Sequence, residues 1–369
     1  MSEALERLRT EMARQGLSAL VALSPENVAY TIGYMVPSHP LNRFRRSISI
    51  LTGDGRSALV VVSVEAELAR QQSRLKDIRS YHQFTQNPMD VLADVLTEFG
   101  VGRGPVAIEL DYLPAQDYLV LRERLPSVSL VPCRDIYLRA RMIKTAEEVA
   151  WLRKIAEVSD RAEQVVWERM REGMTEKALA AVITGAILEE GADGVRMLIG
   201  AGERSAIVNP RPTDRPLGRG DVIRVEILGN LNNFQSNVTR TGVLGRATEE
   251  QRRIWAVLME ARARALERLR PGTAVRDLWE AYAGHCRKHA IEPTLAFLGH
   301  GIGLTGHEEP YLTGDKTLLL EAGMVVTFEP FYMLPPRMGF QIEDMFLVTD
   351  AAYETLTAVT TNETLIEVG

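Results

Sequence analysis

The stretch Gly299-His-Gly-Ile-Gly-Leu-Thr-Gly-His-Glu-Glu-Pro310 holds two of the six histidines in this chain of 369 residues, together with four glycines. Because glycine has no Cβ, a segment so rich in it is typical of backbone that approaches another part of the molecule closely. The stretch therefore predicts a turn-rich loop in which His300 and His307 are candidates for chemistry. The plain alternative is that His300 only caps a turn.

Two glutamates follow in segments that have the apolar character of buried strands. Glu329 lies in Val326-Thr-Phe-Glu-Pro330, and Glu343 lies in Gln341-Ile-Glu-Asp344. A buried carboxylate is costly unless it is paired, protonated or bound to a cation. Pairing with arginines would also satisfy this requirement, so neither glutamate identifies a site by itself.

The C-terminal part of the chain repeats one pattern. Thr145-Ala-Glu-Glu148 and Thr248-Glu-Glu-Gln251 both have the sequence of a capping box, which opens a helix. Each is followed by a long helical pattern, a second helical pattern and two β-like runs. These runs are 221–229 and 234–244 in the first half, and 324–333 and 339–349 in the second half. The offset between the two caps also separates Glu226 from Glu329, so these glutamates occupy equivalent positions. We predict an α+β domain in which two pseudo-symmetric halves pack with strands inside and helices outside.

The first 140 residues have a different pattern, in which short apolar runs alternate with amphipathic helical stretches. They predict a smaller α/β domain without a phosphate-binding loop or a nucleophile elbow. We therefore expect two domains, 1–140 and 141–369, with the chemistry in the second. The predicted strands of the first domain are 17–23, 47–51, 58–64, 105–110 and 127–131.

The composition excludes several classes of protein. The chain is 46% hydrophobic and 25% charged, as ordinary globular proteins are. Its 43 basic and 49 acidic residues give a net charge of −6, without the basic patch that nucleic-acid binding needs. No run reaches the roughly 18 apolar residues of a membrane span, and the charged start does not resemble a signal peptide. We expect a cytoplasmic protein that binds neither nucleic acid nor membranes.

These motifs, in this order, resemble the pita-bread hydrolases, the superfamily of methionine aminopeptidase, aminopeptidase P, prolidase and creatinase. The resemblance covers about residues 145–365, and the first 140 residues look like the N-terminal domain of the creatinase and prolidase branch. It implies a pita-bread catalytic domain, hydrolysis of a C–N bond and a homodimer. Besides the segments around His300, Glu329 and Glu343, it rests on Ser236-Asn-Val-Thr-Arg-Thr241 and Arg211-Pro-Thr-Asp-Arg215.

In the metallopeptidases of that superfamily, two divalent cations are held by Asp, Asp, His, Glu and Glu. The resemblance places His300, Glu329 and Glu343 at the last three of these positions. The first two are altered, to Glu226 and Asn237. Glutamate is one methylene longer than aspartate, and asparagine is neutral and cannot bridge two cations. Because creatinase also works without metal, we expect no metal cofactor. The alternative is one or two ions of Mn, Fe or Zn bound among these five residues, and a single ion on His300, Glu329 and Glu343 stays open because one imidazole and two carboxylates can hold it.

Under the metal-free hypothesis, Glu226 attacks or deprotonates water, a histidine polarises the scissile carbon, and a protonated glutamate assists the leaving nitrogen. The product is a hydrolysed amide, amidine or peptide-like C–N bond in a small molecule or short peptide. Two alternatives stay open: a metal-dependent Xaa-Pro dipeptidase or aminopeptidase, and a non-catalytic pita-bread binding module. The expected catalytic residues are Glu226, His300, His307, Glu329 and Glu343, and the expected substrate-binding residues are Asn209, Arg224, Asn237 and Tyr332.

Overall fold

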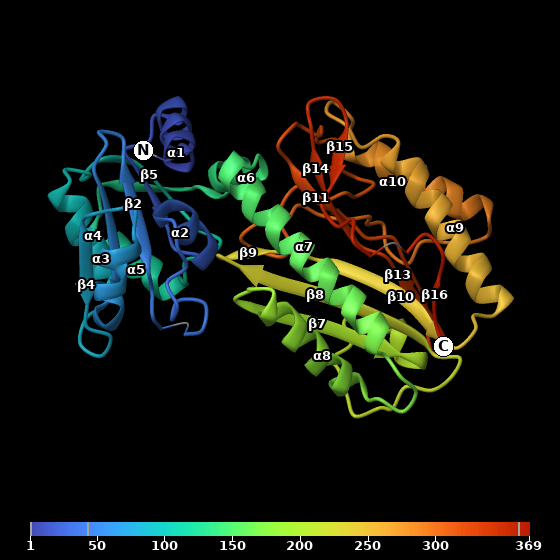
Figure 1. Cartoon of the computed structure of the whole chain (residues 1–369). Coiled ribbons are helices and arrows are strands. Elements are labelled where there is room, and N and C mark those ends of the chain that lie inside the picture. Colours follow the sequence, from blue (N-terminus) through green and yellow to red (C-terminus); the bar gives the residue numbers. More distant parts are fainter. Residues whose placement is uncertain (1, 43, 361) are drawn as a thin grey trace. The chain divides into compact units, whose positions relative to one another are not determined.

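The computed structural model describes residues 2–42, 44–360 and 362–369. The chain divides into two compact units, Met1–Arg141 and Met142–Gly369 (Figure 1). In the described part of the chain, no helix is both long and apolar enough to cross a membrane. Each unit has its own sheet and its own buried apolar core.

The N-terminal unit is built on a six-stranded mixed sheet in the order β4-β3-β2-β1-β5-β6. The strand β4 was not predicted, because its sequence Ile-Arg-Ser-Tyr is short and half exposed, as an edge strand is. The expected α/β character is confirmed. The strands are β1 (Ala19–Ala22), β2 (Ile48–Thr52), β3 (Ser57–Val62), β4 (Ile78–Tyr81), β5 (Gly104–Ile108) and β6 (Val128–Pro132), and the helices are α1 (Glu3–Gln15), α2 (Pro25–Ile32), α3 (Ala66–Gln72), α4 (Pro88–Glu98), α5 (Ala115–Arg124) and α6 (Arg134–Met142).

The C-terminal unit places two pairs of long helices outside a set of strands (Figure 1). The helices are α7 (Ala146–Arg169), α8 (Glu176–Glu189), α9 (Glu249–Leu266) and α10 (Val275–Lys288). The larger sheet contains β7 (Gly194–Ala201), β8 (Val222–Leu231), β9 (Phe234–Gln235), β10 (Val238–Leu244) and β16 (Ile366–Val368), and the shorter strands are β11 (Val325–Phe328), β12 (Phe331–Leu334), β13 (Met338–Gln341), β14 (Asp344–Val348) and β15 (Tyr353–Thr355).

Both predicted capping boxes are present, and they confirm the internal repeat. The hydroxyl of Thr145 accepts from the amide of Glu148 at 3.2 Å, and the Glu148 carboxylate accepts from the amide of Thr145 at 2.7 Å. Thr248 and Gln251 make the same two bonds at 3.2 and 2.7 Å. Each box satisfies two amides at the start of a long helix, so α7 and α9 begin where the sequence indicates.

The two predicted β-like runs of the second half, 324–333 and 339–349, are each interrupted. Pro330 has no N–H and ends β11, while Glu329 donates its own amide to the carbonyl of Leu298 at 2.8 Å. Between β13 and β14, Glu343 exchanges backbone hydrogen bonds with Thr239 of β10, at 3.0 and 3.1 Å. Both glutamates therefore lie where the backbone passes from one small sheet to another.

Candidate metal centre

Three side chains from three segments of the C-terminal unit converge: His300, Glu329 and Glu343. One ligand atom of each lies within 4.8 Å of the other two. The Nε2 atom of His300 is 3.2 Å from Glu329 Oε1 and 3.6 Å from Glu343 Oε1. All three residues are buried. The structure thus brings together one imidazole and two carboxylates that are far apart in the sequence.

The facing atoms of these side chains lack hydrogen-bond partners. His300 Nε2, Glu329 Oε1 and Glu343 Oε1 are all buried and unbonded, although the distances between them are short. The other ring nitrogen of His300, Nδ1, lies 2.9 Å from the carbonyl of Gly301, an arrangement typical of a metal-binding histidine. Leaving a buried polar atom unbonded costs about 1–3 kcal/mol. One divalent cation would satisfy all three atoms, so the residues present fit a single metal ion.

Electrostatics at the centre favour added positive charge. Burial raises the pKa of Glu329, and burial together with the charge of Glu329 raises the pKa of Glu343 to about 7. Burial by itself would lower the pKa of His300, but the nearby carboxylates of Glu329 and Glu343, at 3.2 and 3.6 Å, outweigh it and raise this pKa to about 10. The cluster therefore holds protons near neutrality when no cation is bound. A metal ion would balance the carboxylate charge in their place.

The glycine-rich loop that carries His300 packs tightly against its own unit. A Cβ at Gly299 would lie 2.1 Å from the carbonyl oxygen of Thr327, and one at Gly301 would lie 2.2 Å from that of Glu309. The predicted close approach is therefore confirmed, and it is to backbone of the same protein. A buried ion pair between Lys144 and Glu308, at 3.0 Å, further fixes the loop.

Glu343 is held in place from β10. The hydroxyl of Thr239 donates to Glu343 Oε2 at 3.2 Å, and Arg240 donates to the Glu343 carbonyl at 2.8 Å. Arg240 also pairs with Asp160 at 3.2 Å and with Asp344 at 2.8 Å. The Thr-Arg pair of the Ser-Asn-Val-Thr-Arg-Thr motif thus orients this ligand through both its side chain and its backbone.

Glu329 is oriented by a residue that sequence reasoning missed. Gln341 Nε2 donates to Glu329 Oε2 at 3.2 Å, and Gln341 Oε1 accepts from Arg224 Nη1. Arg224 is 1% exposed and also donates to the backbone carbonyls of Ile207 and Val208. Because these partners engage its guanidinium, we propose that Arg224 positions Gln341, in place of the substrate contact expected for it. The sequence offered one signal for this role. Gln341 lies two residues before Glu343 in a β-like run, and side chains at this spacing point to the same face of a strand.

Replacing Gln341 with leucine tests this network. The change removes the donor to Glu329 and the acceptor of Arg224 in a buried region, so we expect the free energy of unfolding to fall by about 1–3 kcal/mol. Outer partners of metal ligands matter for affinity, so manganese affinity should fall roughly 10- to 100-fold. Urea unfolding and manganese titration measure the two effects. Gln164→Leu, at an exposed position of α7, is the matched control; equal manganese affinity in the two variants would contradict this role.

The two altered positions of the family motif lie in β8, for Glu226, and directly before β10, for Asn237. Thr239 pairs in register with Glu226 on one side and bridges to Glu343 on the other. Glu226 lies outside the group of mutually close ligand atoms and is 3.8 Å from Arg224 Nη1. Burial, and then the charge of Glu343, raise the pKa of Glu226 to about 7. Asn237 is 1% exposed, and its Oδ1 is buried without a hydrogen-bond partner.

The remaining candidates differ in their exposure and in their contacts. The ring of His307 stacks on that of His300, with centroids 3.6 Å apart and planes 17° apart, and its side chain is exposed. Phe297, which the sequence did not single out, stacks parallel to both histidines with centroids 6.1 and 6.5 Å away. Asn209 is exposed after the short helix Gly202–Ala206, and Tyr332 is half-buried in β12. Their roles toward substrate stay predictions.

Comparison with known proteins agrees with this geometry. The sequence profile of metallopeptidase family M24 matches residues 150–350, and that of the creatinase/prolidase N-terminal domain matches residues 5–143. The chain belongs to metallopeptidase family M24. It is 28% identical to an Xaa-Pro dipeptidase of Pyrococcus furiosus, over 97% of this chain and 98% of that protein. It is 30% identical to a probable dipeptidase PepE of Mycobacterium tuberculosis, over 92% of this chain and 89% of that protein.

Solved structures show the same architecture over the whole length. The prolidase from Pyrococcus furiosus superposes with a TM-score of 0.84 at 27% identity, covering 96% of this chain and 100% of that one. The X-Pro aminopeptidase from Thermotoga maritima gives a TM-score of 0.88 at 25% identity, covering 100% of both. The predicted pita-bread fold, the creatinase-type N-terminal domain and the class of C–N hydrolase are therefore confirmed.

The expectation that no metal cofactor is used is wrong. The chain belongs to a family of metallopeptidases, and three ligand atoms without other partners face one another at His300, Glu329 and Glu343. The prediction gave most weight to the changes at Glu226 and Asn237. Those changes leave intact the three residues His300, Glu329 and Glu343, a donor set that suits one divalent ion.

Proposed function

We propose that this protein is a metal-dependent hydrolase of Xaa-Pro dipeptides and short Xaa-Pro peptides, with one divalent ion at His300, Glu329 and Glu343. The observation that carries the proposal is the convergence of three buried, unbonded ligand atoms within 4.8 Å. The substrate class rests on the relatives named Xaa-Pro dipeptidase and on the similarity that extends over the whole chain. Mn²⁺, Fe²⁺ and Zn²⁺ all suit this donor set.

When bound, such an ion would polarise the scissile carbonyl and lower the pKa of a water molecule. The side chains around it supply the remaining functions. Glu226 lies beside the ligands without being one of them, so its carboxylate is free to accept a proton from water as a general base. The exposed ring of His307 offers a donor to the substrate carbonyl, and Phe297 provides an apolar wall suited to a proline ring.

The change at position 237 is the reason for proposing one ion. Two divalent ions side by side need a carboxylate that bridges them, and the amide of Asn237 is neutral and offers one oxygen. Its Oδ1 lies buried without a partner, which leaves it available to contact bound water or substrate. We therefore propose that Asn237 contacts substrate or water, and that His300, Glu329 and Glu343 bind the metal ion. A homodimer and a cytoplasmic location stay predictions.

Removal and return of metal tests the proposal. The full-length protein is treated with a chelator, dialysed and assayed on Xaa-Pro dipeptides and on matched dipeptides without proline. We expect hydrolysis of the Xaa-Pro dipeptides to disappear and to return with Mn²⁺, Fe²⁺ or Zn²⁺, each added separately. Full activity after complete removal of metal would overturn the metal-dependent assignment. Metal-dependent cleavage of only the dipeptides without proline would overturn the substrate class.

A further inference from the structure

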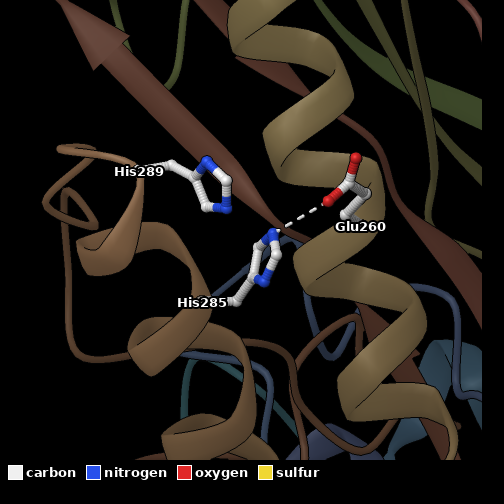
Figure 2. Close-up of side chains that lie close together, drawn as sticks. All are labelled: Glu260, His285 and His289. Atoms are coloured by element: carbon white, nitrogen blue, oxygen red, sulfur yellow. Dashed lines mark ion pairs between the residues drawn. The ribbon is translucent and has the colours of Figure 1, made fainter.

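A second group of metal-binding side chains lies between the helices α9 and α10. Glu260 belongs to α9, His285 belongs to α10, and His289 is the residue that caps the C-terminal end of α10. One ligand atom of each lies within 4.8 Å of the other two. Figure 2 shows both imidazole rings extending from α10 toward Glu260. None of these residues belongs to the centre at His300.

The spacing of the two histidines places both on one face of the helix. Residues four apart are neighbours on a helical surface, and pairs of histidines at this spacing can bind one metal ion together. Here the centroids of the two rings are 4.6 Å apart, with their planes inclined by 36°. Two rings so close together are well placed to share a cation.

The inner histidine, His285, has an unsatisfied ring nitrogen. Its side chain is 6% exposed, and its Nε2 lies 3.2 Å from Glu260 Oε2. This nitrogen is nevertheless buried without a hydrogen-bond partner. A buried ring nitrogen that faces a carboxylate without a hydrogen bond to it has the geometry of a metal ligand.

The space beside the histidines can admit an ion together with its water. A cavity of about 380 Å³ opens there, whereas one water molecule occupies roughly 30 Å³ of liquid volume. The cavity is lined by the basic residues Arg264, Arg268 and Lys288 and by the acidic residues Glu267 and Glu280. With the nearby carboxylate of Glu260, the numbers of basic and acidic side chains are equal, so the charge of the lining does not oppose a cation.

We propose that Glu260, His285 and His289 bind one divalent transition-metal ion of the zinc type, which joins α9 to α10. Zinc bonds to nitrogen and oxygen are about 2.0–2.2 Å long, so two ligands on a tetrahedral ion lie about 3.4 Å apart. The separation of 3.2 Å between His285 Nε2 and Glu260 Oε2 is close to this value. Two imidazoles favour zinc or nickel over magnesium or calcium, and three protein ligands leave one position for water.

Zinc titration of matched variants of the full-length protein tests the proposal. Glu260 is 63% exposed and His289 is exposed, so Glu260→Gln and His289→Gln leave the buried ring of His285 in place. The control is His82→Gln, which replaces an exposed histidine of the N-terminal unit. Equilibrium dialysis followed by elemental analysis gives the zinc bound per chain, and anomalous diffraction at the zinc edge locates each ion.

We expect the wild type and His82→Gln to bind one more zinc ion per chain than Glu260→Gln and His289→Gln. In these two test variants, the zinc affinity of the site between α9 and α10 should fall at least roughly 100-fold. An anomalous peak between the three side chains is expected in the wild type. Equal zinc content in all four proteins, or no peak there, would overturn the proposal. Because the result is a difference between variants, it does not depend on whether the centre at His300 binds metal or supports hydrolysis.

Discussion

A chain with Glu343→Gln is expected to lose the manganese bound at the His300 centre and to hydrolyse Xaa-Pro dipeptides with a kcat/KM at least roughly 100-fold lower. The substitution keeps the size of the side chain, but it removes one of the two carboxylates that face His300 Nε2. The backbone bonds between Glu343 and Thr239 stay available, so the fold should persist. Manganese analysis, steady-state kinetics and circular dichroism give the three measurements.

Glu163→Gln is the matched control, because Glu163 is also a fully buried glutamate of the C-terminal unit. Burial raises the pKa of Glu163 well above its usual value, which favours the neutral form of its carboxyl. A raised folded-state pKa gives stability that is lost as pH rises above about 4.5. Glu163→Gln should therefore reduce this loss while leaving metal content and activity intact. If Glu343→Gln behaved like this control, Glu343 would not be a ligand.

The substitution Asn237→Asp is expected to raise the manganese bound at the centre from one ion per chain to two. A carboxylate at this buried position can bridge two cations, whereas the amide cannot, and Glu226 lies nearby to complete the second position. Elemental analysis at saturating manganese measures the change, and a crystal structure locates the ions. The control is Asn232→Asp, at an exposed turn.

Failure of Asn237→Asp to bind a second ion would show that the longer side chain of Glu226, and not the amide alone, prevents a dinuclear centre. Two ions already present in the wild-type protein would contradict the explanation altogether. The outcome therefore separates the effects of the two altered positions, which the sequence alone cannot do.

Local signals in the sequence predicted much of the C-terminal unit. The capping boxes at Thr145 and Thr248 need only four residues each, so the starts of α7 and α9 could be read directly. The strand β7 was missed, because the glycines at Gly194 and Gly200 weaken its pattern. The breaks at Glu329 and Glu343 were missed as well, because they depend on pairing with Leu298 and Thr239, which are distant in the sequence.

In the candidate site as well, sequence motifs identified single residues, but not the contacts between segments that are distant in the sequence. The motifs identified His300, Glu329 and Glu343, and the substitution at Asn237 was visible in the sequence. The bonds from Arg224 through Gln341 to Glu329 join different strands and could not be anticipated. Nor could the sequence show that three ligand atoms are left unbonded and close together. Without this information, the prediction of a metal-free site gave too much weight to the changes at Glu226 and Asn237.

The number of metal ions at the His300 centre tests the central claim most directly. The wild-type protein is stripped of metal, equilibrated with manganese and crystallised, and the ions are counted by elemental analysis and located by anomalous scattering. One ion between His300 Nε2 and the carboxylates of Glu329 and Glu343 is the predicted result. A centre that stays empty at saturating manganese, or one that holds two fully occupied ions, would contradict it.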